Sequence, residues 1–175
     1  MTELPCTPGQ TVGPFLGLGL PYPGDSDLVA DGHPHAVRLH GTVYDGAGEA
    51  VPDALVELWQ RDGAGRIPRR EGSLRRGDAG FTGWGRCATD AAGHYAFTTV
   101  PPGADSGRPP FFAIAVFARG LLHRLFTRAY LPHVEVNADA ALAALVCISE
   151  NDGATYRFDI HLQGPNETVF LEFRR

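Results

Sequence analysis

Several features that would place this chain in a functional class at once are missing from its sequence. It has only three cysteines in 175 residues. They are far apart and odd in number, which favours reduced thiols and a cytoplasmic setting over a disulfide framework. No apolar run approaches the roughly 20 residues that a membrane-spanning helix needs. The first ten residues resemble no secretory signal, so we expect a cytoplasmic protein without membrane contact.

The charge balance argues against a nucleic-acid partner. Twenty acidic residues against 15 basic ones give a net charge of −5, and no basic run dominates the chain. Hydrophobic residues make up 43% of the sequence, which indicates a globular protein. The 22 glycines and 14 prolines favour many turns, and therefore short strands over long helices.

The common catalytic and metal-binding motifs are also missing. The seven histidines form no Cys/His or His-Glu-x-x-His pattern, and no nucleophile elbow or phosphate loop is present. His33 and His35 have alternate spacing, but the intervening proline makes them a weak metal signal. The other histidines are expected to be surface or hydrogen-bonded residues. The residue types alone therefore predict no catalytic constellation in this chain.

The most informative stretch that is present covers residues 107–131, which we interpret as two neighbouring strands. Apolar residues fill both alternating sets of the first strand: Phe112, Ile114 and Val116 on one side, Ala113, Ala115 and Phe117 on the other. Two apolar faces are typical of a buried sheet. Arg119 and Gly120 are expected to form the turn before a second, more polar strand.

The rest of the chain is typical of short strands joined by turns. Further strands are predicted over residues 37–43, 54–60, 87–89, 94–98, 155–162 and 167–173, a long loop over 66–86 and one helix over 138–148. About eight strands at this spacing predict an all-β fold, an antiparallel β-sandwich with an extended N-terminal arm and one short helix.

Residues 1–35 look like that arm, preceding a single domain over residues 36–175. The segment is rich in proline and glycine and has no core of its own. Six apolar residues make it too hydrophobic for a solvated tail: Leu4, Val12, Phe15, Leu16, Leu18 and Leu20. We expect the arm to pack on a partner, with a loose tail as the alternative.

The chain resembles the intradiol ring-cleavage dioxygenases. The matching segments run in order along nearly the whole sequence: residues 7–15 (TPGQTVGPF), 41–46, 56–62, 85–90, 117–120, 127–128 and 156–160. The resemblance implies a β-sandwich and a ferric (Fe3+) chemistry that inserts both atoms of O2 into an aromatic ring between two hydroxyl-bearing carbons.

Some members of this family contain two kinds of chain, and the resemblance is closest to the kind that binds no iron. The iron-bearing beta chain holds Fe3+ through two tyrosines and two histidines. The matching positions here carry Ile67, Asp105, Phe111 and Ala113. Three of these side chains offer no lone pair, so the resemblance implies no metal in this chain and Fe3+ in a partner beta chain.

A metal-free chain of this kind still shapes the active site, which lies at the interface of the two chains. The resemblance carries over to Thr11, Gly13, Pro14 and Phe15 on the arm and to Arg119 on the hairpin turn. It implies a hetero-oligomer acting on protocatechuate and O2. An arginine near the pocket would offset the burial of the substrate carboxylate and steer its approach.

Two other functions stay open. A stand-alone binding module of the transthyretin-like or carboxypeptidase-regulatory-like type would fit residues 41–60, but would need neither the apolar arm nor the match over 156–160. A self-sufficient dioxygenase would need the iron ligands that the sequence lacks.

Overall fold

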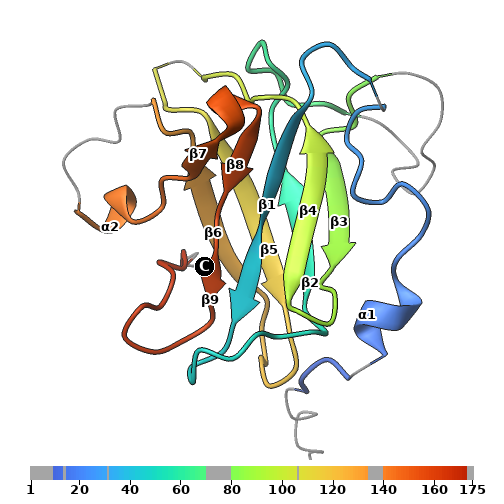
Figure 1. Ribbon diagram of the computed structural model, residues 1–175, viewed down its shortest axis with the longest axis vertical. Coiled ribbons are helices and arrows are strands. Elements are labelled where there is room, and N and C mark those ends of the chain that lie inside the picture. Colours follow the sequence, from blue (N-terminus) through green and yellow to red (C-terminus); the bar gives the residue numbers. More distant parts are fainter. Residues whose placement is uncertain are drawn as a thin grey trace, which may run out of the picture.

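The computed structural model describes residues 10–13, 15–30, 32–69, 80–105, 107–133 and 140–172. In this part of the chain, two sheets pack face to face as a sandwich (Figure 1). The predicted β-sandwich is therefore confirmed. Among the helices that the structure describes, none is long and apolar enough to cross a membrane.

The first sheet is built around β1 (Val37–Tyr44). On one side β1 pairs antiparallel with β4 (His94–Thr99). On the other side it pairs parallel with β8 (Thr155–Arg157) and then with β9 (Ile160–His161). The edge strand β7 (Ile148–Glu150) is antiparallel to β8. This sheet is thus mixed, whereas the sequence predicted antiparallel pairing throughout.

The second sheet is antiparallel, with the strand order β3-β2-β5-β6. It contains β3 (Trp84–Ala88), β2 (Leu55–Trp59), β5 (Phe111–Phe117) and β6 (Leu125–Tyr130). The strands β5 and β6 form the hairpin predicted from residues 107–131. Gly120 supplies the positive φ of 87° that the connecting turn requires.

The core lies between the two sheets, where alternate side chains of the central strands are fully buried. Leu39 and Val43 of β1 face Val56 of β2 and Phe112 of β5. Burial of each such side chain contributes roughly 1.5–3 kcal/mol. Tyr95 of β4 places a polar hydroxyl in this core, and that hydroxyl donates to the Phe158 carbonyl at 2.5 Å. Burial raises the pKa of Tyr95 well above its usual value, so the phenol stays protonated.

The helix predicted over residues 138–148 is wrong for most of its length. Helix α2 covers only Ala140–Ala143, and residues 138 and 139 lie outside the described part of the chain. Beyond α2 the backbone pairs with Tyr130 of β6: Tyr130 N donates to Leu145 O and Cys147 N donates to Tyr130 O, both at 2.8 Å. This pairing buries Leu145 and Cys147, so tertiary contacts overrode the helix propensity of alanine and leucine.

Four further features differ from prediction. Trp84, Gly85 and Arg86, assigned to a loop, begin β3. The run 155–162 is interrupted between β8 and β9, where the Asp159 carboxylate accepts a hydrogen bond from the backbone of β1. A short 3-10 helix, Asn151–Gly153, precedes β8. Residues 167–172 form no strand; isolated backbone hydrogen bonds hold them, such as Leu171 N to Phe126 O at 2.7 Å.

The N-terminal arm divides into two parts in the structure. The first holds the short helix α1 (Leu16–Gly19), on which Phe15 and Leu18 are 76% and 77% exposed. The second packs on this chain itself, because Leu28 is fully buried and its amide donates to the Thr98 carbonyl of β4. A role of residues 1–35 in binding a partner stays a prediction.

Candidate functional site

Arg119 lies in an ion pair at one end of the sandwich. Asp53 precedes β2 and Arg119 follows β5, and these antiparallel strands bring the two residues to the same end. Nε of Arg119 pairs with a carboxylate oxygen of Asp53. The Arg119 side chain is 58% exposed while that of Asp53 is 19% exposed, so the aspartate anchors a guanidinium that still faces solvent.

The arm reaches this same end of the molecule. The amide of Gly120 donates to Oγ1 of Thr11 at 2.6 Å, which ties the arm to the hairpin turn. A Cβ built on Gly17 of α1 would touch the Asp53 backbone at 3.6 Å, so the helix lies beside the same aspartate. The structure therefore places Thr11 against the turn that carries Arg119, and a role of either residue in lining a substrate cavity stays a prediction.

The other predicted arm residues are less constrained. Gly13 is exposed, and a side chain there would meet nothing within 4 Å among the described residues. Phe15 projects from the start of α1. Pro14 lies outside the described residues. Sequence reasoning missed Asp53, because 66 residues separate it from Arg119 and no motif marks it.

The four degenerate ligand positions do not offer an iron site. Ile67 is exposed on its loop. Asp105, the one potential ligand, is held by Arg61, whose Nη2 lies 2.7 Å from a carboxylate oxygen. Phe111 and Ala113 carry no lone pair. Ferric iron needs anionic or imidazole ligands, so these residues do not fit it. Among the described residues, no group of three or more His, Cys, Asp or Glu could hold a metal ion.

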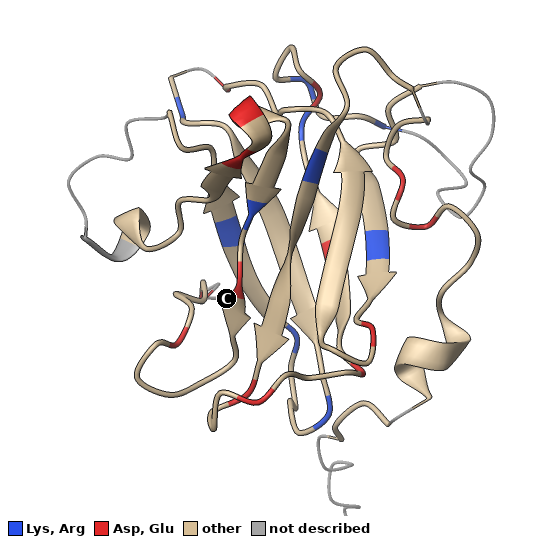
Figure 2. Cartoon of the chain, viewed as in Figure 1, with Lys and Arg blue, Asp and Glu red and all other residues tan. Residues whose placement is uncertain are grey.

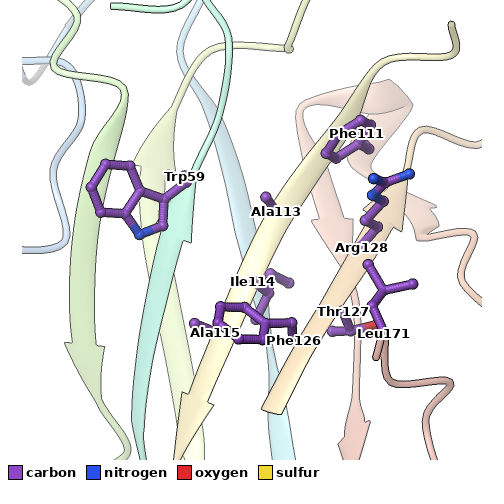
Figure 3. A pocket seen from close by; sticks show the side chains of 9 residues that line it. All are labelled: Trp59, Phe111, Ala113, Ile114, Ala115, Phe126, Thr127, Arg128 and Leu171. Carbon is purple, nitrogen blue, oxygen red and sulfur yellow. The ribbon is translucent and has the colours of Figure 1, made fainter. Parts of the chain in front are cut away.

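Phe111 and Ala113 instead line an apolar pocket of about 420 Å3 on the outer face of the second sheet (Figure 3). Trp59 of β2 and Arg128 of β6 are the cross-strand neighbours of Ala113. Phe126 of β6 is the neighbour of Ala115. The pocket exists because two small side chains of β5 lie between large ones on both adjacent strands.

Among the described residues, neither cysteine is an activated nucleophile. Burial raises the pKa of the Cys147 thiol to about 12 and also raises that of Cys87. His40 lies 3.0 Å from Glu150, and His161 stacks on Tyr44. In the described part of the chain, basic and acidic positions are interspersed along strands and loops (Figure 2).

Comparison with known proteins identifies the family of this chain. A family model described as "Dioxygenase" matches residues 23–164. The protocatechuate 3,4-dioxygenase alpha chain of Burkholderia cepacia is 38% identical, and the match covers 98% of this chain and 100% of that protein. The beta chain of the enzyme from the same organism is 33% identical, over 83% of this chain and 74% of that protein.

A solved structure supports the fold. The dioxygenase domain of a dioxygenase–carbohydrate-binding protein fusion from Streptomyces sp. SirexAA-E superposes with a TM-score of 0.62. It is 24% identical, and the match covers 79% of this chain and 87% of that one.

Proposed function

The chain belongs to the intradiol ring-cleavage dioxygenase family, and we propose that it is the alpha subunit of a protocatechuate 3,4-dioxygenase that binds no iron itself. It completes the active-site cavity of an iron-bearing beta chain within a hetero-oligomer. The assembled enzyme converts protocatechuate and O2 to 3-carboxy-cis,cis-muconate, a step in the breakdown of aromatic acids.

One observation carries this proposal: the chain is similar over its whole length to an alpha chain, and its degenerate ligand positions do not fit iron. A self-sufficient dioxygenase would require ligands at Ile67, Asp105, Phe111 and Ala113. Asp105 is the only potential ligand among these four, and its charge is already paired with Arg61.

The contribution of this chain to the reaction is binding and orientation. The Fe3+ of the beta chain would supply the chemistry that adds both oxygen atoms to the ring. Arg119 presents a guanidinium whose terminal nitrogens form no hydrogen bond to a described residue, because only Nε engages Asp53. Those nitrogens suit the substrate carboxylate, which an arginine can bind in a forked geometry. Thr11 holds the arm against this turn.

Native mass spectrometry with metal analysis tests the assembly. The chain should be co-produced with a beta-type chain from the same source organism. We expect an equimolar complex that carries about one iron per pair of chains and consumes O2 with protocatechuate. An iron-free monomer that does not bind the beta-type chain would refute the proposal and favour a stand-alone binding module.

A further inference from the structure

We propose that the pocket on the outer face of β2, β5 and β6 is a ligand site for a planar aromatic carboxylate without ring hydroxyls. This site is separate from the chain end that carries Arg119, and the inference does not depend on the proposed function. It rests on the walls of the pocket, on the cations around it and on the scarcity of other polar groups there.

The walls of the pocket suit a flat apolar body. Trp59, the last residue of β2, is 52% exposed and lines the pocket together with Phe111 of β5 and Phe126 of β6. Aromatic rings stack favourably on such side chains in offset or edge-to-face arrangements. Ligand pockets are typically roughly 300–1,000 Å3 in volume, so about 420 Å3 can hold a bicyclic ring.

Two arginines lie over the phenylalanine rings of this pocket. The Arg128 guanidinium is 4.4 Å from the ring centre of Phe111 (Figure 3), and that of Arg124 is 4.9 Å from the ring centre of Phe126. Neither forms an ion pair with a described residue. By contrast, Arg86 on the same sheet pairs with Glu57 at 3.2 Å. The pocket is thus flanked by two positive charges in a chain whose net charge is −5, which favours an anion.

Arg128 is the better placed of the two. It lines the pocket directly, opposite Ala113, and the hydrogen bond that its side chain makes to a described residue is from Nη1 to the Tyr130 hydroxyl, at 3.4 Å. A guanidinium that lies over an aromatic ring can still offer N–H donors to a carboxylate. A carboxylate bound there would direct the attached ring toward Trp59 across Ala113.

The pocket offers little to a second polar substituent. Besides Arg128, its polar lining groups are the Trp59 indole N–H and the Thr127 hydroxyl, and that hydroxyl already donates to the Val169 carbonyl at 2.8 Å. Two adjacent ring hydroxyls of a ligand would therefore lose their water and gain few partners, which is unfavourable. The preferred ligand should differ in this respect from protocatechuate.

Calorimetric titration of the full-length chain with 2-naphthoate tests the site. We expect 2-naphthoate to bind at least tenfold more tightly than its neutral analogue 2-naphthalenemethanol and more tightly than 3,4-dihydroxybenzoate. Arg128→Leu should weaken binding of the acid by roughly tenfold or more and that of the alcohol less than threefold. Ala113→Phe should abolish binding of both by filling the hollow. Arg38→Leu, at an exposed arginine of β1 in the opposite sheet, is the matched control and should change neither.

Each other outcome overturns the proposal. No saturable binding of 2-naphthoate, or binding that Ala113→Phe leaves intact, removes the pocket as the site. Equal affinity for acid and alcohol would make it an apolar surface without selectivity for anions. If the free chain binds 2-naphthoate but its complex with a beta-type chain does not, the occupant in the assembly is a segment of the partner. Should Arg128→Leu fail to fold, Ala113→Phe and the ligand pair still decide the question.

Discussion

Arg119→Ala removes the guanidinium that the proposed function places beside the substrate carboxylate. A hydrogen bond to a charged group is worth roughly 1.5–3 kcal/mol, which corresponds to roughly a 10- to 150-fold change in kcat/KM. Because the Arg119 side chain is 58% exposed, the loss should lie at the low end of that range, near tenfold. The ion pair with Asp53 is partly exposed, so its removal should cost the fold less than about 1 kcal/mol.

The assay is O2 uptake by the assembled enzyme with protocatechuate and with catechol, which lacks the carboxylate. We expect kcat/KM to fall about tenfold for protocatechuate and less than threefold for catechol. The difference should shrink as ionic strength rises, since salt screens exposed charges. Arg119→Lys should retain part of the effect because it keeps the charge without the planar fork.

Arg66→Ala is the matched control. Arg66 is also an exposed arginine paired with one aspartate, Asp62, but it follows β2 and so lies at the opposite end of the sandwich. It should leave both substrates unaffected. Equal losses on protocatechuate and catechol after Arg119→Ala would show that Arg119 acts on assembly or folding and not on the carboxylate.

Four further predictions concern stability and assembly. Gly41→Ala should destabilise the chain by about 3 kcal/mol in urea unfolding, because a Cβ there would collide with the Phe158 carbonyl; a near-normal midpoint would contradict this packing. Tyr95→Phe should cost about 1–3 kcal/mol by leaving that buried carbonyl without its donor, and an unchanged melting temperature would count against the bond. Burial raises the pKa of Cys147 from 9.0 to about 12, so its thiol should carry about a thousandfold less thiolate than an ordinary thiol and should resist alkylation at pH 8 until the chain unfolds. Because the pKa is higher in the folded chain than in the unfolded one, the contribution of this thiol to stability is complete below pH 9.0 and is lost as the pH rises toward about 12. Deleting residues 1–20 removes exposed Phe15 and Leu18 and should weaken the complex with the beta chain, whereas an unchanged elution volume on a sizing column would mean that the arm is not an assembly element.

The hairpin of β5 and β6 could be predicted because its cause is local. Alternation of apolar residues fixes the two faces of β5, and Gly120 marks the turn. The segment after α2 could not be predicted in this way. Its alanines and leucines favour a helix locally, but Leu145 and Cys147 gain more from pairing with Tyr130 and from burial.

The candidate site depends on both resemblance and tertiary structure. Resemblance suggested Thr11 and Arg119, and the structure places the Thr11 hydroxyl on Gly120, next to Arg119, at one end of the sandwich. Their role in a substrate cavity stays a prediction. Asp53 is brought to Arg119 only by the pairing of β2 with β5. The pocket likewise depends on strand register, because the alanines at 113 and 115 make a hollow only when large residues flank them on both sides.

The parallel pairing of β1 with β8 and β9 has a consequence for how the chain is made. Thr42 of β1 and Asp159, which accepts its amide hydrogen bond, are 117 residues apart. At a synthesis rate of roughly 5–20 residues per second, roughly 6 to 23 s pass between the synthesis of Thr42 and that of Asp159. During this interval the edge of β1 that later pairs with β8 and β9 is unpaired, and an unpaired strand edge can associate with other chains. Mutations that slow the arrival of the C-terminal strands should therefore lower soluble yield more than they lower the stability of the finished protein.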